Sequence, residues 1–105
     1  MGFLFNGKPD VRALASRQNA PGLVEAAGLQ DIAPGADGGT VDLGAPVREA
    51  ATLALGGLGS EAGSEAVVAA LADSTDRVRA AAVRVLYARE AATRPRRPVR
   101  LTAAA

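Results

Sequence analysis

The sequence contains no cysteine and no histidine, and aromatic residues make up only 3% of its 105 residues. Without cysteine there can be no disulfide framework, no thiolate nucleophile and no thiolate metal site. Without histidine as well, neither a zinc site of the usual type nor a Ser-His or Cys-His nucleophile can be built. We therefore expect a protein that is not an enzyme and that holds no metal or cofactor.

Long apolar segments are also missing. The apolar stretch at residues 1–5 is too short for a signal-peptide core or a membrane span. The formal net charge is +1, which by itself favours neither binding to nucleic acid nor its absence. We expect a cytoplasmic protein without membrane association.

Alanine dominates what is present. Hydrophobic residues make up 49% of the chain, and many of them are alanines, which are the best helix formers. Strand-favouring aromatic residues are few, so the composition favours helices. The length allows one small domain, and an alanine-rich core removes little apolar area from water. We expect a helical domain with a thin stability margin.

Five helical stretches are predicted, at residues 10–17, 19–27, 46–58, 61–72 and 76–94. The clearest is the third, in which Val47, Ala51 and Leu55 belong to one apolar stripe with helical spacing. The fourth begins at Ser60 or Ser64 as N-cap. Its inward-facing residues are expected to be Val67, Val68 and Leu71.

One pattern occurs twice, with a spacing of 31 residues. A shift by this distance superimposes identical residue types: Asp42 on Asp73, Val47 on Val78, Arg48 on Arg79, Ala50 and Ala51 on Ala81 and Ala82, and Leu55 on Leu86. A helical pair that repeats at 20 to 50 residues cannot bury its apolar stripe alone and stacks on a neighbour. The repeat therefore predicts a chain of stacked helical hairpins.

The residues from Asp73 to Ala82, together with 65–71 before them, resemble the bacterial HEAT-like repeats of the phycobilisome-lyase type. Residues 7–14 and 22–26 are similar to the N-terminal start of such proteins. This resemblance implies an all-α fold, a short α-solenoid of antiparallel helical pairs. About five helices would make roughly two repeats plus an N-terminal helix.

The resemblance also implies a ladder of hydrogen bonds between adjacent repeats. In this sequence the ladder would pair Asp42 with Arg48 and Asp73 with Arg79. These four residues are structural candidates and not catalytic ones.

Two regions depart from the repeat pattern. Residues 29–45 are rich in glycine and show no sustained periodicity, so a long loop is expected inside a helical domain of residues 1–94. Residues 95–105 are expected to be a basic, proline-containing, disordered tail. The arginines that could contact an acidic partner are Arg94, Arg96, Arg97 and Arg100.

The leading functional interpretation is a non-enzymatic scaffold for protein–protein interaction, whose concave surface is formed by the second helix of each pair. With about two repeats, the last helix leaves part of its apolar face exposed, so a protein partner or self-association is expected rather than nucleic acid. Two alternatives stay open. One is an accessory subunit of a bilin-lyase-like or other HEAT-repeat enzyme, and the other is association with nucleic acid through the tail.

Overall fold

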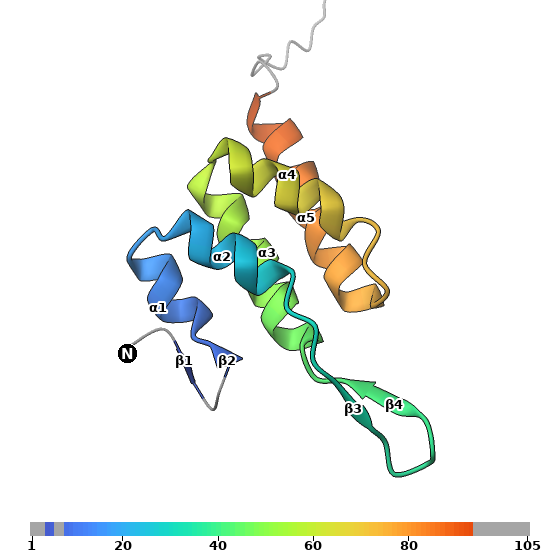
Figure 1. Ribbon diagram of the computed structural model, residues 1–105. Helices are drawn as coiled ribbons and strands as arrows, with labels where there is room; N and C mark the ends of the chain where they lie inside the picture. Colours follow the sequence, from blue (N-terminus) through green and yellow to red (C-terminus); the bar gives the residue numbers. More distant parts are fainter. Residues whose placement is uncertain (1–3, 6–7, 94–105) are drawn as a thin grey trace, which may run out of the picture.

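The computed structural model describes residues 4–5 and 8–93 of the chain (Figure 1). Its helices are α1 (Val11–Ser16), α2 (Ala20–Ala27), α3 (Ala45–Leu58), α4 (Glu61–Ala70) and α5 (Asp76–Thr93). Two antiparallel strand pairs accompany them: β1 (Leu4–Phe5) with β2 (Lys8–Pro9), and β3 (Ile32–Pro34) with β4 (Thr40–Asp42). The mostly helical fold with five helices is confirmed, and the expected tail at 95–105 lies outside the described residues.

Side-chain caps fix the first residues of three helices. Asp10, Asn19 and Ser60 each accept a hydrogen bond from the backbone amide three residues further along, at 3.2, 3.0 and 3.0 Å. Each bond satisfies an amide that has no partner within its helix. The N-cap of α4 is therefore Ser60, and Ser64 lies inside the helix.

The helices form two layers. In Figure 1, α2 and α4 lie in front, with α3 and α5 behind them. Contacts join α2 to α3 and α4 to α5 within each pair, and α2 to α4 and α3 to α5 between the pairs. The short helix α1 packs against α2 and α3 at the N-terminal side. Consequently α3 touches every other helix and forms the centre of the domain.

The core consists of small and medium aliphatic side chains from all five helices. Leu23, Leu55, Val67 and Val78 are fully buried in it, surrounded by alanines. Because α3 is covered on several sides, its buried face is wider than one apolar stripe and includes the polar residues Arg48 and Thr52. Thr52 satisfies its hydroxyl with a 2.7 Å bond to the carbonyl oxygen of Arg48.

The predicted inward face of α4 is partly wrong. Val67 is fully buried as expected, but Val68 and Leu71 are exposed. On a helix, Val68 lies about 100° around the axis from Val67, so both can be buried only if neighbours cover two sides. Here α2, α3 and α5 contact α4, and the side that carries Val68 faces outward.

The expected loop at residues 29–45 contains the β3–β4 hairpin instead. Ile32 pairs with Asp42, Ala33 with Val41 and Pro34 with Thr40. The turn is closed by a 2.8 Å bond from the Gly35 amide to the Gly39 carbonyl, and Gly38 adopts a positive φ of 89°. The hairpin extends away from the helices (Figure 1), and it brings Asp42 to the beginning of α3.

Candidate functional site

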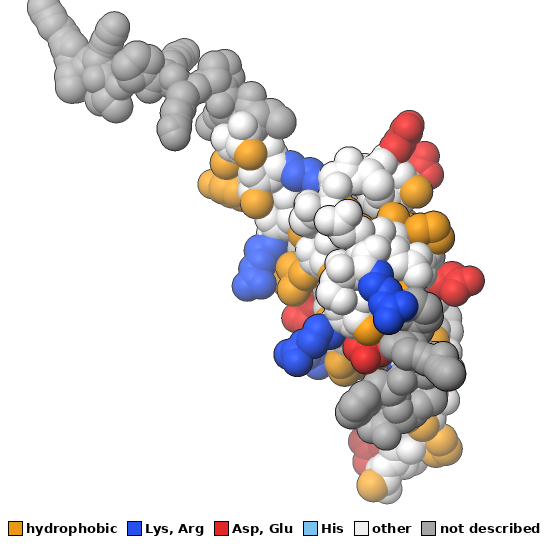
Figure 2. All heavy atoms as spheres, turned by 90° about the vertical axis from the view of Figure 1, so that its left-hand side faces the viewer, with side chains coloured by type: hydrophobic (Ala, Val, Ile, Leu, Met, Phe, Trp, Pro, Cys, Tyr) orange, Lys and Arg blue, Asp and Glu red, His pale blue; other side chains and the backbone are white. Residues whose placement is uncertain are grey.

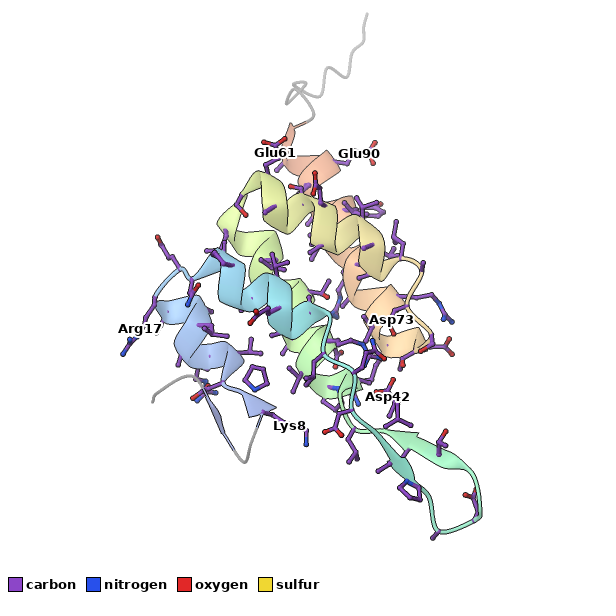
Figure 3. The ribbon with its side chains drawn as sticks, viewed as in Figure 1. Lys8, Arg17, Asp42, Glu61, Asp73 and Glu90 are labelled. Carbon is purple, nitrogen blue, oxygen red and sulfur yellow. The ribbon has the colours of Figure 1, made fainter. Side chains whose placement is uncertain are left out.

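Arg48 is the largest fully buried side chain among the described residues, and it is only 1% exposed. Its Nε donates to Asp73 at 2.8 Å, and its two terminal nitrogens donate to Asp42 at 2.9 and 2.5 Å. Further bonds reach the Leu29 carbonyl at 2.9 Å and the Thr75 hydroxyl at 3.1 Å. Figure 3 shows both aspartates on the same side of the N-terminal part of α3, with Asp73 above Asp42.

The two carboxylates are bonded to groups other than the arginine as well. The Thr75 hydroxyl donates to Asp42 at 3.0 Å, and the Thr75 amide donates to Asp73 at 2.9 Å. The Gly44 amide donates to the other Asp42 oxygen at 3.2 Å. One cation therefore lies between two anions, and each anion receives a further hydrogen bond, which is the condition under which buried charge is tolerated.

The same contacts shift the pKa values in the cluster. The hydrogen bond from Arg48 lowers the pKa of Asp42 from 3.8 to about 2, with Thr75 contributing. Burial raises the pKa of Asp73, but the bonds from Arg48 and Thr75 outweigh burial, so its net pKa is lowered. The bonds from Asp42 and Asp73 raise the pKa of Arg48. All three groups are charged at neutral pH.

The cluster joins segments that are distant in sequence. Leu29 follows α2, Asp42 ends β4, Arg48 lies on α3, and Asp73 and Thr75 belong to the connection between α4 and α5. The arginine's five N–H donors all have acceptors nearby. The arrangement leaves no donor for a ligand and acts as a structural clamp between the two helical pairs.

Of the two contacts implied for the ladder, Asp42 with Arg48 is present. The carboxylate of Asp73 bonds to Arg48 of the preceding pair and not to Arg79. Arg79 instead donates to the backbone carbonyl of Asp73 at 2.7 Å and to the carboxylate of Asp76. The sequence pattern identified the clamp residues, but it assigned Asp73 to the wrong arginine.

A surface hollow runs along α5 where α3 meets it. Its two halves share Arg84 and Ala88 and are lined mainly by apolar atoms. One half is bordered by Glu49, Arg77, Val83 and Tyr87, and the other by Leu53, Gly56, Arg89 and Ala92. We call this hollow the α3–α5 groove. The repeat pattern predicts a binding surface on these second helices, but the sequence does not show which residues line it.

Three arginines of α5 lie along the α3–α5 groove. Arg77 is paired with Glu49 at 2.8 Å, and Arg89 donates to the Ser64 hydroxyl at 2.8 Å. One terminal nitrogen of Arg89 is buried without a hydrogen-bond partner. Arg84, between them, is exposed and forms no ion pair with a described residue. The groove combines an apolar floor with the exposed guanidinium of Arg84.

Charge is divided between the two layers. Helices α2 and α4 contain glutamates but no lysine or arginine, whereas the arginines of the helices lie on α1, α3 and α5. Figure 2 shows acidic side chains along the upper right-hand edge and basic side chains along the left. Helices α3 and α5 also carry the acids Glu49, Asp76 and Glu90, so the layer that contains the α3–α5 groove has a small excess of arginines over acids.

Comparison of the chain with protein-family models, with curated proteins and with solved structures found no match. Within the described residues, no helix is both long and apolar enough to cross a membrane. The same part of the chain has no group of three or more acidic side chains arranged to hold a metal ion. The tail arginines Arg94, Arg96, Arg97 and Arg100 lie outside the described residues, and their contact with an acidic partner stays a prediction.

Proposed function

We propose that the protein is a HEAT-like helical scaffold that binds a segment of another protein in the α3–α5 groove. The groove itself carries this proposal, because it is an apolar hollow on the surface formed by the second helices of two stacked pairs. In this proposal α2 with α3 and α4 with α5 are the repeats of a short solenoid, and α1 covers its N-terminal side. The location that fits this role is the cytoplasm.

The chemistry of the groove indicates the kind of segment that fits. Leu53, Val83 and Tyr87 offer apolar contacts, and all three are exposed. Arg84 can donate to a carboxylate through a bidentate pair, and the small excess of arginines in its layer favours an acidic ligand. We therefore expect a short protein segment that combines acidic residues with apolar anchors. Such grooves commonly take an amphipathic helix.

The clamp at Arg48 supports this function indirectly. It joins α3 to the segment directly before α5, and α3 and α5 form the walls of the groove. A rigid surface loses less conformational entropy when a ligand binds. The ionic cluster thus acts as a support for the binding surface rather than as a part of it.

The test compares charge reversal at two exposed arginines, one in the groove and one away from it. The full chain is immobilised and exposed to a library of labelled peptides in which acidic and apolar residues recur with the spacing of an amphipathic helix. We expect Arg84→Glu to abolish capture, while Arg12→Glu on α1, with the same change of charge away from the groove, leaves capture unchanged. Circular dichroism checks that both variants remain folded.

Capture that is lost equally in both variants would indicate nonspecific attraction and contradict the proposal. Capture that survives Arg84→Glu and Leu53→Asp would contradict a role for the groove. Photo-crosslinking from position 53 then identifies the bound segment in cell extract, and a crosslink to nucleic acid instead of protein would favour the alternative function.

A further inference from the structure

The outer side of the second helical pair carries an exposed apolar surface. Val68 of α4 and Leu71 directly after it are 54% and 40% exposed, and Val83 and Tyr87 of α5 are 53% and 72% exposed. We call this surface the end face. It is composed of Val68, Leu71, Arg79, Val83, Leu86, Tyr87 and Glu90. Exposed apolar side chains gathered in this way mark interaction surfaces.

The internal repeat relates the end face on α5 to the equivalent side of α3. The shift of 31 residues places Thr52 on Val83, Leu55 on Leu86 and Gly56 on Tyr87. On α3 the corresponding side is covered by α5, since Thr52 and Leu55 are fully buried. A Cβ atom on Gly56 would lie only 2.7 Å from the methyl groups of Val85. The end face is thus the α5 equivalent of a surface that another helix covers on α3.

Two residues differ from α3 in ways that prevent the same packing. Where Gly56 lets α5 approach α3 closely, the end face has the large side chain of Tyr87. Where α3 has Ala45, α5 has Asp76, which accepts a hydrogen bond from Arg79. A helix packed on α5 must therefore lie at a greater distance than α5 does from α3.

The charges of the end face are self-complementary in one arrangement. Arg79, Val83, Leu86 and Glu90 follow one another at spacings of four, three and four residues, which is the seam of a helix that pairs with another helix. If a second α5 lies antiparallel across a two-fold axis between Val83 and Leu86, Arg79 of each copy faces Glu90 of the other. Val83 of each copy then faces Leu86 of the other in the centre, where Leu86 is partly buried because it also packs against the core of its own chain. A parallel arrangement would place like charges opposite one another.

We propose that the protein forms a two-fold symmetric dimer through the end face, with the two α5 helices antiparallel. Symmetry makes each favourable contact occur twice, and the two Arg79–Glu90 pairs fix the register. The guanidinium of Arg79 uses two donors within its own chain, so others remain for Glu90 of the second copy. Tyr87 and Val68 flank the seam and add apolar contact area.

This dimer goes beyond the proposed function and does not depend on it. Val83 and Tyr87 border both the end face and the α3–α5 groove, but Leu53, Arg84 and Arg89 line only the groove. The groove half between Leu53 and Ala92 stays open in the dimer. A protein segment can bind there in the dimer through Leu53 and Arg84, while the contacts to Val83 and Tyr87 are open only in the monomer.

Sedimentation equilibrium of the full chain over a range of concentrations tests the proposal. We expect a monomer–dimer equilibrium that Arg79→Glu or Glu90→Arg alone weakens by about tenfold, because each change places two like-charged pairs in the seam. The double variant R79E/E90R restores opposite charges and should recover most of the lost affinity. This recovery is specific to the antiparallel register.

Two further variants separate loss of the seam from loss of the fold. Val83→Asp should give a monomer with unchanged circular dichroism, whereas Leu53→Asp, which changes an exposed apolar residue outside the end face, should remain dimeric. A wild-type chain that stays monomeric at high concentration would overturn the dimer. A dimer that survives Val83→Asp would place the interface elsewhere, and failure of the double charge reversal to recover affinity would overturn the antiparallel pairing.

Discussion

Arg48 and Asp73 are joined by two hydrogen bonds of 2.8 and 3.0 Å, although they belong to different helical pairs. Asp42 holds the other side of the same guanidinium. A charge that is 1% exposed is stable only because both acids approach it. The relationship explains why the two pairs hold a fixed position relative to each other, and it leads to the first two predictions.

Replacement of Arg48 by leucine should destabilise the protein strongly. The change leaves the carboxylates of Asp42 and Asp73 close together without a cation, and breaking a buried ion pair costs about 3 kcal/mol or more. Arg48→Lys keeps the charge but loses the planar set of donors, so its cost should be smaller. Urea unfolding followed by circular dichroism measures both. Equal losses for the two variants would show that charge neutralisation contributes nothing.

Acid should weaken the folded state between about pH 4 and pH 2. The pKa of Asp42 falls from 3.8 to about 2 on folding, because Arg48 bonds to its charged form. As the pH falls, the unfolded chain therefore takes up the proton first, and the stabilisation present above pH 4 is lost. Asp73, whose pKa is also lowered, acts in the same direction.

The matching variant is Asp42→Asn. It should be less stable than wild type at neutral pH and should lose less stability on acidification, because the group that titrates has been removed. Urea midpoints measured from pH 7 to about pH 2 check this expectation. A variant with an acid dependence as steep as that of wild type would contradict the role of Asp42.

Two neighbouring glycines of α3 should respond in opposite ways to alanine. A Cβ atom at Gly56 would lie 2.7 Å from both methyl groups of Val85, so Gly56→Ala should cost about 1 to 3 kcal/mol through overpacking. At Gly57 nothing lies within 4 Å of the added atom, and helix propensity should make Gly57→Ala more stable by about 1 kcal/mol. Thermal unfolding of the two variants gives the comparison. Stabilisation by both changes would show that α3 and α5 can move apart without cost.

Sequence patterns predicted the helices well where local chemistry defines them. The caps at Asp10, Asn19 and Ser60 and the proline in the first turn of α3 act within a few residues, so they can be recognised without knowledge of the fold. The β3–β4 hairpin was missed because its strands are short and largely exposed, and its glycines and prolines are typical of loops. Periodicity carries little signal when neither face of a strand is buried.

The candidate surfaces could be predicted from the sequence less well than the helices, because they depend on tertiary packing. Val67 and Val68 are chemically alike and adjacent, yet one is fully buried and the other is 54% exposed. The difference comes from which helices lie next to α4. The α3–α5 groove likewise exists only because two helices separated by α4 pack side by side.

The sequence by itself determined the number and positions of the helices, and it marked Asp42 and Asp73, like Arg48 and Arg79, as equivalent positions of a repeat. It did so because helix propensity, capping and the 31-residue repeat are properties of short segments. Only the tertiary structure decided that Asp73 bonds to Arg48 and not to Arg79. The reason is geometric: α4 lies between the two acids in the chain, and packing of the second pair on the first brings Asp73 to the side of α3, where a buried guanidinium requires a second anion.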